Sequence, residues 1–132
     1  MVLTSMIHFS TLKWMCEKIP NTAWSSNVMT FWIVAGVFIV HMVEIVLYAL
    51  AYWFSEQILQ IGSLRGLEAH APYDYLYYSA VTFTSLGIGD IFPSGHIRFL
   101  TGVEALNGLI LIAGSASFIY FAISKLWKWE KK

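Results

Sequence analysis

Two long apolar segments most constrain what this chain can fold into. The first runs from about residue 28 to 54 and contains only two ionisable residues, His41 and Glu44. The second runs from about residue 97 to 124 and contains only Arg98, near its start, and Glu104. A helix needs about 20 apolar residues to cross a bilayer, so both segments are long enough to span. The pattern predicts an integral membrane protein with two transmembrane helices.

Composition supports the same class. Of 132 residues, 58% are hydrophobic and 12% are charged, and a soluble domain usually has about 25% charged residues. A soluble chain this short could not bury so much apolar surface. The net charge is zero, which gives no basis for a nucleic-acid partner, and no soluble partner is evident. Cys16 is the sole cysteine and forms no internal disulfide.

Basic and aromatic residues predict the orientation. Lysines gather in the two tails, whereas the connecting region holds only Arg65 and Arg98. Basic residues favour the cytoplasmic side, so we expect a multi-pass protein of the cell membrane with both termini in the cytoplasm. Residues 1–27 are expected to form a cytoplasmic or interfacial segment, either an interfacial helix or a partly ordered tail. Tryptophans mark the ends of both spans, as in the aromatic belts of membrane proteins: Trp24, Trp32, Trp53, Trp127 and Trp129.

The connecting region is more than a loop. Residues 55–72 are mixed in character and are expected to be exposed. Residues 73–84 are highly aromatic and too short to span, which is typical of a re-entrant helix. They are followed by Ser85-Leu86-Gly87-Ile88-Gly89-Asp90. Pro93 and Gly95, which disfavour regular secondary structure, then separate this segment from the second span.

The Gly-X-Gly spacing predicts an unusual backbone. If residues alternate between right- and left-handed conformations, their carbonyl groups all point the same way, and glycine takes the left-handed state most cheaply. Gly87 and Gly89 can alternate in this way with Leu86 and Ile88. Such a strand presents a row of carbonyl oxygens that can replace the water shell of a cation.

Residues 77–90, Tyr-Tyr-Ser-Ala-Val-Thr-Phe-Thr-Ser-Leu-Gly-Ile-Gly-Asp, resemble the pore helix and selectivity filter of potassium channels. The usual pattern there is two aromatic residues, a threonine-rich short helix and Thr-Val-Gly-Tyr-Gly-Asp. Gly108 follows Arg98 by ten residues, which is similar to the spacing between a basic residue and the hinge glycine in bacterial two-helix channels. The resemblance covers about residues 28–124.

The resemblance implies an all-α pore domain that assembles as a homotetramer in the lipid bilayer. Its parts are an outer helix 28–54, a turret 55–72, a pore helix 73–84, a filter 85–90 and an inner helix 97–124, before a basic cytoplasmic tail 125–132. It implies a passive potassium-selective channel, with no cofactor besides K⁺ as the permeant ion. K⁺ is expected at Ser85, Leu86, Gly87 and Ile88, and Gly89 completes the filter. The remaining implied roles are filter support (Tyr77, Tyr78, Thr84 and Asp90) and a gating hinge (Gly108).

The filter departs from the usual pattern at three positions: Ser85 replaces threonine, Leu86 valine and Ile88 tyrosine. Ile88 cannot make the hydrogen bond by which the tyrosine braces the filter, so we expect it to pack against Tyr77 or Tyr78. A looser filter is the basis of one alternative, a weakly selective cation channel on the same scaffold. Another alternative is a non-conducting accessory subunit. No nucleophile–base pair or metal-ligand cluster has a workable spacing, so we do not expect an enzyme.

Ionisable groups inside the spans leave further alternatives open. His41 and Glu44, one helical turn apart, are either a proton or ion sensor or a pair that braces the first helix against the second near Glu104, and we favour bracing. A haem held by His41 and His96 is disfavoured, because the two lie at different depths. Asn107 and Ser115 either face a cavity or pack between helices. No arginine-rich helix predicts voltage sensing, so the sequence does not indicate a gating stimulus.

Overall fold

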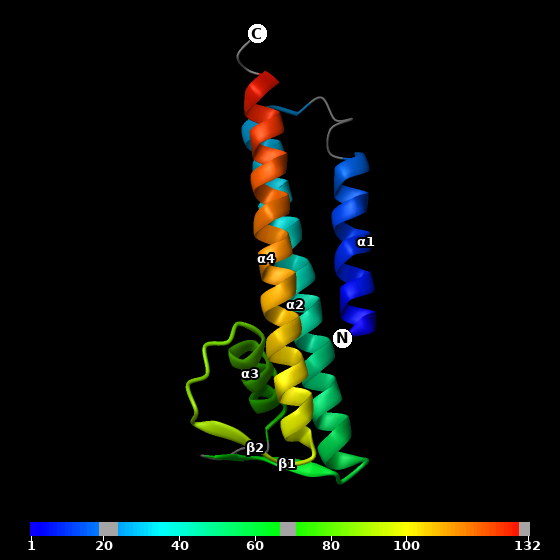
Figure 1. Ribbon diagram of the computed structural model, residues 1–132, viewed down its shortest axis with the longest axis vertical. Helices are drawn as coiled ribbons and strands as arrows, with labels where there is room; N and C mark the ends of the chain where they lie inside the picture. Colours follow the sequence, from blue (N-terminus) through cyan, green and yellow to red (C-terminus); the bar gives the residue numbers. More distant parts are fainter. Residues whose placement is uncertain (19–23, 67–70, 130–132) are drawn as a thin grey trace. The chain divides into compact units, whose positions relative to one another are not determined.

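A computed structural model describes residues 1–18, 24–66 and 71–129, and side chains up to residue 126. The fold is mostly helical (Figure 1). Its elements in chain order are α1 (Val2–Lys18), α2 (Ser26–Gln57), β1 (Gly62–Gly66), α3 (Pro72–Phe83), β2 (Ile91–Gly95) and α4 (Ile97–Trp129).

The chain forms two compact units. One consists of Val43–Ile110 together with Met1, and the other of Val2–Met42 and Leu111–Lys132. Both long helices are continuous across the boundary. The first unit therefore holds the second part of α2, the β-strands, α3 and the start of α4.

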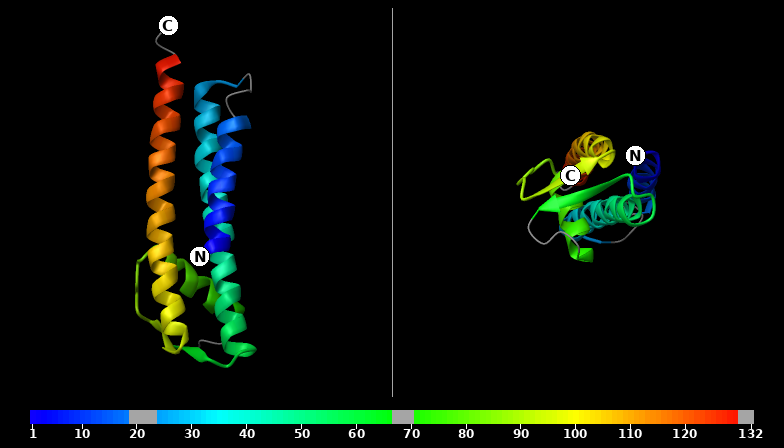
Figure 2. Two further views of the ribbon diagram at one scale, coloured as in Figure 1. Left: turned by 45° about the vertical axis from the view of Figure 1, so that its right-hand side comes forward. Right: turned by 90° about the horizontal axis from the view of Figure 1, so that it is seen from below.

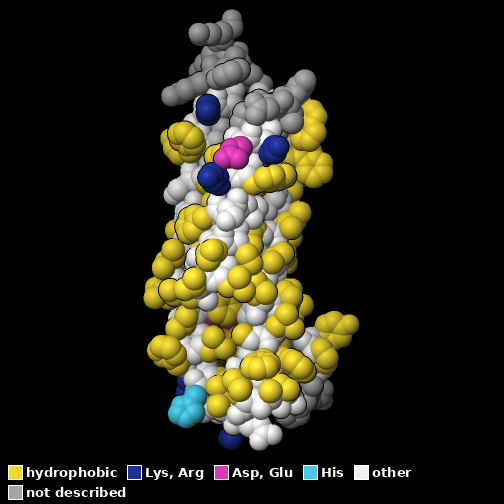
Figure 3. Space-filling model, turned by 90° about the vertical axis from the view of Figure 1, so that its right-hand side faces the viewer, with side chains coloured by type: hydrophobic (Ala, Val, Ile, Leu, Met, Phe, Trp, Pro, Cys, Tyr) yellow, Lys and Arg dark blue, Asp and Glu magenta, His cyan; other side chains and the backbone are white. Residues whose placement is uncertain are grey.

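The helices α2 and α4 are long and apolar enough to cross a membrane. Such helices also occur in the cores of soluble proteins, but only 39% of the apolar window of α2 and 22% of that of α4 is buried. Hydrophobic side chains predominate on the face shown in Figure 3. Apolar surface on this scale requires lipid or other protein to cover it. The helices thus have the composition and exposure of membrane spans.

In the first unit, α3 precedes residues 85–90 and β2 follows them; β2 pairs with β1, which comes before α3 in the chain. Pro72 stands at the beginning of α3, where its missing N–H costs nothing, and the Ala71 N–H donates to the Asp74 carboxylate at 2.9 Å. β1 and β2 pair antiparallel, with Leu64 opposite Pro93. The Glu56 carboxylate accepts hydrogen bonds from the Leu64 N–H at 3.1 Å and from the Tyr75 hydroxyl at 3.2 Å. One side chain of α2 therefore holds both β1 and α3.

In the second unit, α1 lies beside α2 (Figures 1 and 2). Its buried residues recur every three or four positions and form one face: Thr4, His8, Leu12 and Met15. Met15 packs against α2 where Gly36 leaves room, since a Cβ at Gly36 would lie 2.8 Å from the Met15 Cε. Residues 2–18 are thus a packed helix rather than a loose tail.

The predicted boundaries agree closely with these elements. The expected outer helix 28–54 lies within α2, the expected pore helix 73–84 is shifted by one residue from α3, and the expected inner helix 97–124 begins with α4 but ends five residues earlier. The all-α prediction is incomplete, because β1 and β2 form a ribbon. Parts of three predicted segments lie outside the described residues: 19–23 of the N-terminal segment, 67–70 of the turret and 130–132 of the basic tail.

Candidate functional site: residues 85–90 and their supports

Residues 85–89 have an alternating backbone. Ser85, Gly87 and Gly89 have φ values of 57°, 58° and 85°, whereas Leu86 and Ile88 do not have positive φ. The alternation begins directly after α3, where the N–H groups of Ser85 and Leu86 donate to the carbonyls of Thr82 and Val81 at 2.9 Å. These bonds satisfy carbonyl groups that the end of a helix leaves unpaired. The backbone predicted from the glycine spacing is confirmed.

The carbonyl oxygens of residues 85–89 are available to a ligand. Within the part of the chain that the structure describes, no group donates a hydrogen bond to any of them. The side chains of Leu86 and Ile88 are 66% and 57% exposed, and no atom lies within 4 Å of the position a Cβ would take at Gly87. A polar backbone in apolar surroundings needs partners. The carbonyl oxygens of this segment can bind a cation, but those of one chain contact the cation from one side only.

Tyr77 and Asp90 support the outer end of the segment. The Tyr77 hydroxyl donates to the Asp90 Oδ2 at 2.8 Å, and the Asp90 Oδ1 accepts from the Ile91 N–H at 2.9 Å. The hydrogen bond to Asp90 raises the pKa of Tyr77 above its ordinary value, because ionising the phenol would remove the donated proton. α3 is therefore tied to the residue that follows Gly89.

The back of α3 is held by a buried polar cluster. The Glu104 carboxylate accepts a short hydrogen bond from the Tyr52 hydroxyl, and its Oε1 lies 2.6 Å from the Ser79 Oγ. The Ser79 Oγ also lies 2.8 Å from the Ile45 carbonyl oxygen. Buried carboxylates require such donors. Glu104 thus joins α2, α3 and α4, whereas the sequence analysis assigned bracing to His41 and Glu44.

The side chains of Tyr78 and Thr84 form hydrogen bonds with groups outside residues 85–90. The Tyr78 hydroxyl lies 2.9 Å from the Thr101 Oγ1 of α4, and its ring packs edge-on against Tyr52 with centroids 5.0 Å apart. The Thr84 Oγ1 donates to the Ala80 carbonyl at 2.7 Å, within its own helix end. Tyr78 therefore supports the segment only by holding α3. Ile88 is 57% exposed in the single chain, and its packing against Tyr77 or Tyr78 stays a prediction.

Gly108 lies where α4 meets the end of α3. A Cβ at this position would lie 2.0 Å from the Phe83 carbonyl oxygen, closer than any real contact. The close approach requires glycine whether or not α4 bends there. The hinge role expected for Gly108 stays a prediction. The close approach of the Phe83 carbonyl is a second reason why this position needs glycine.

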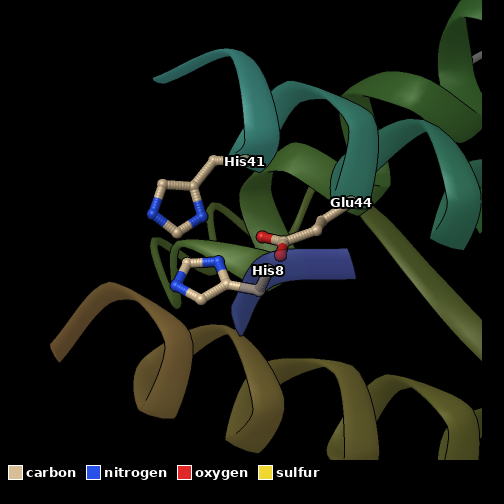
Figure 4. Close-up of side chains that lie close together, drawn as sticks. All are labelled: His8, His41 and Glu44. Atoms are coloured by element: carbon tan, nitrogen blue, oxygen red, sulfur yellow. The ribbon is translucent and has the colours of Figure 1, made fainter. Parts of the chain in front are cut away.

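In the second unit, the fold brings together residues that the sequence analysis did not connect. The Ser115 Oγ lies 3.2 Å from the His8 Nε2 and 3.1 Å from the His41 Nε2. Ser115 therefore packs between helices, and His41 contacts α4 at Ser115 rather than near Glu104. His8 and His41 therefore lie side by side although they are far apart in the sequence (Figure 4), and the sequence analysis assigned no role to His8. His8 lies on the buried face of α1 with Leu12, four residues later. This helical spacing is the feature of the sequence that could have indicated that His8 is buried.

In a comparison with protein families, the model of the family described as "Ion channel" matches residues 27–125. Neither the curated proteins nor the solved structures contain a match to this chain. The matched region includes both apolar helices, α3 and residues 85–90. It covers most of the chain, and so this integral membrane protein belongs to the ion channel family.

Proposed function

We propose that this protein is the subunit of a passive potassium-selective channel and that residues 85–90 are its selectivity filter. The alternating φ values at residues 85, 87 and 89 carry the proposal. Alternation turns successive carbonyl groups to one side, and a row of such oxygens replaces the hydration shell of a K⁺ ion. In this function Ser85, Leu86, Gly87 and Ile88 bind K⁺, and α3 is the pore helix. Conduction is passive, with no catalytic step or cofactor.

The position of α3 supports cation binding. The helix ends at Phe83, directly before the proposed filter. The carboxyl end of a helix carries a partial negative charge, which favours a cation within about one turn. Carbonyl dipoles from α3 and from the filter thus act on the same ion.

We also propose a homotetramer in the cell membrane with both termini in the cytoplasm. A single chain contributes one row of oxygens, and an ion needs oxygens on all sides. Non-helical backbone is stable at membrane depth only when protein buries it or water lines it, so neighbouring copies would cover Leu86 and Ile88. The distribution of lysines supports the orientation.

The test is the reversal potential of purified protein in a planar bilayer, with K⁺ on one side and Na⁺ on the other. Each tenfold preference for K⁺ shifts the reversal potential by about 59 mV for a monovalent ion at 25 °C. We expect a shift above that value. A potential near zero would mean that both ions permeate alike, and the weakly selective channel would replace this proposal.

A measurable K⁺ current is itself part of the test. Gly89→Ala, which forces a side chain into a left-handed position, serves as the non-conducting control. If the unmodified protein carried no more current than this variant, the accessory-subunit alternative would hold.

A further inference from the structure

Several oxygen atoms meet behind α3, within the first unit. The Ser79 Oγ lies 2.8 Å from the Ile45 carbonyl oxygen and 2.6 Å from the Glu104 Oε1. Ser79 and Glu104 are both fully buried, and buried polar groups are hydrogen-bonded. Each of these close oxygen–oxygen contacts therefore needs a proton between its two atoms.

The Ser79 hydroxyl has a single proton to place between two acceptors. If that proton goes to the Ile45 carbonyl, which can only accept, the contact with Glu104 needs a proton from Glu104. If the proton goes to an ionised Glu104 instead, the Ser79 Oγ and the Ile45 carbonyl oxygen face each other with lone pairs alone. Their distance of 2.8 Å is that of an O–H···O hydrogen bond. Both contacts are hydrogen bonds only when the Glu104 Oε1 carries a proton.

The other oxygen of Glu104 receives its proton from Tyr52. The Tyr52 hydroxyl donates to the Glu104 Oε2. Its other neighbour is the Thr101 Oγ1, at 3.4 Å. Thr101 donates to the Ile97 carbonyl at 3.1 Å and accepts from the Tyr78 hydroxyl at 2.9 Å, so it does not need the Tyr52 proton. The Glu104 Oε2 is therefore an acceptor, and the proton of the carboxyl group falls on Oε1.

The charges around Glu104 agree with a neutral acid. A buried carboxylate needs a cation paired with it. Within the part of the chain that the structure describes, no lysine, arginine or histidine side chain forms an ion pair with Glu104. The cationic group that acts on it is the Met1 amino group, more weakly than burial does. The titratable side chains that act on it are the phenols of Tyr52 from α2 and Tyr78 from α3.

We propose that Glu104 is a neutral carboxylic acid and that it positions α3 through Ser79. The hydrogen bonds then run in one direction from α4 to α2, because Glu104 donates to Ser79 and Ser79 donates to Ile45. α3 ends at Phe83, directly before the proposed filter, so these bonds hold the helix from which residues 85–89 continue. The effect on ions rests on the proposed channel function, whereas the proton on Glu104 does not. Glu104 is thus a positioning residue that does not itself bind the ion.

Infrared spectroscopy of the full chain in lipid tests the proton directly, because a carboxylic acid has a C=O stretching band that a carboxylate lacks. Glu104→Gln keeps a donor and an acceptor at nearly the same size, so we expect it to fold. The spectrum of the unmodified protein at neutral pH minus that of Glu104→Gln should contain the acid band. Carboxylate bands in this difference spectrum would overturn the proposal.

Glu56→Gln is the matched control for the spectra. The Glu56 carboxylate accepts hydrogen bonds from the Leu64 N–H at 3.1 Å and from the Tyr75 hydroxyl at 3.2 Å. Both partners donate, so no proton on Glu56 is needed. The spectrum of the unmodified protein minus that of Glu56→Gln should therefore contain carboxylate bands and no acid band.

Permeation through the protein in a planar bilayer tests the positioning role. Glu104→Gln retains a donor to Ser79 and should keep the K⁺/Na⁺ permeability ratio of the unmodified protein. Glu104→Asp is one methylene shorter, and it should lower the ratio about tenfold, the size expected for losing a hydrogen bond to a buried group. A ratio that fell in Glu104→Gln, or one that did not fall in Glu104→Asp, would overturn the positioning role. If the unmodified protein carried no K⁺ current, the proposed function would fail, and the infrared spectra would still decide where the proton lies.

Discussion

At the scale of single residues, position 85 shows which side chains the alternating backbone accepts. Ser85 has a left-handed backbone with φ of 57°, which costs a non-glycine residue about 1–2 kcal/mol. A β-branched residue fits this conformation less well than serine does. Strained backbone of this kind persists where the surrounding structure enforces it, often at functional sites. Ser85 thus keeps a hydroxyl near the proposed ion path with less steric strain than threonine.

We expect Tyr77→Phe to reduce selectivity, because it removes the hydrogen bond to Asp90 and frees the outer end of residues 85–90. The measurement is the K⁺/Na⁺ reversal potential, which should move toward zero by tens of millivolts. Tyr73→Phe is the control, since Tyr73 is on the same helix and 80% exposed. An unchanged potential in Tyr77→Phe would show that this contact does not brace the filter.

The same hydrogen bond predicts a pH dependence. The raised pKa of Tyr77 keeps its proton in place until the pH exceeds the ordinary tyrosine value of about 10. The bond should therefore persist across the neutral range and be lost only as the pH rises through the raised pKa. Selectivity that fell between pH 6 and 9 would have to arise from another group.

Ser79→Ala tests the buried cluster behind α3. Removing the hydroxyl takes a partner from the Glu104 carboxylate, and leaving a buried acceptor short of a donor costs about 1–3 kcal/mol. The thermal midpoint of the purified protein should fall. Ser117→Ala is the matched control, because Ser117 is exposed and hydrogen-bonds only to its own helix. Equal midpoints for the two variants would contradict a stabilising role for the cluster.

At the scale of elements, the helices could be predicted from the sequence and the ribbon could not. Long apolar runs specify α2 and α4 locally, and the aromatic stretch before Ser85 specifies α3. β1 has no alternating apolar pattern, and Pro93 in β2 argues against a strand. Their pairing depends on which segments the helices bring together, which is non-local information. For the N-terminal segment, the sequence left a helix and a partly ordered tail open, and the structure shows the helix α1. The placement of α1 at the membrane interface stays a prediction.

We expect Gly108→Ala to disrupt the junction of α3 and α4, because the new Cβ would meet the Phe83 carbonyl oxygen. Size-exclusion chromatography in detergent should show less assembled protein. Gly114→Ala is the control in the same helix: the nearest atom to its Cβ is the Phe9 Cε1 at 4.0 Å, and alanine favours a helix over glycine by about 1 kcal/mol. Normal assembly with altered gating in Gly108→Ala would instead favour the hinge.

At the scale of the whole molecule, features that depend on residues close together in the sequence could be predicted, and contacts between distant segments could not. The alternating backbone of residues 85–89 could be predicted because glycine spacing specifies it within a few residues. Glu104 with Tyr52, and His8 with His41, depend on helix packing over long stretches of sequence. The residues around His8 in α1, some apolar and some polar, do not indicate which side chain His8 contacts. The sequence therefore predicted the alternating backbone but not the polar contacts that hold the surrounding helices.

The exposure of residues 85–89 in a single chain predicts that several copies assemble. Leu86 and Ile88 expose most of their apolar side chains in a single chain, and the carbonyl groups of residues 85–89 have no donors among the described residues. Both features are resolved when copies of the segment close around an axis, and closed cyclic symmetry is the common form of homo-oligomer. Family resemblance implies four copies. Crosslinking in mild detergent should give a ladder that ends at four subunits, and protein unfolded in strong detergent beforehand should stay monomeric. A ladder that ended at two would rule out the tetramer, because two rows of oxygens cannot surround an ion.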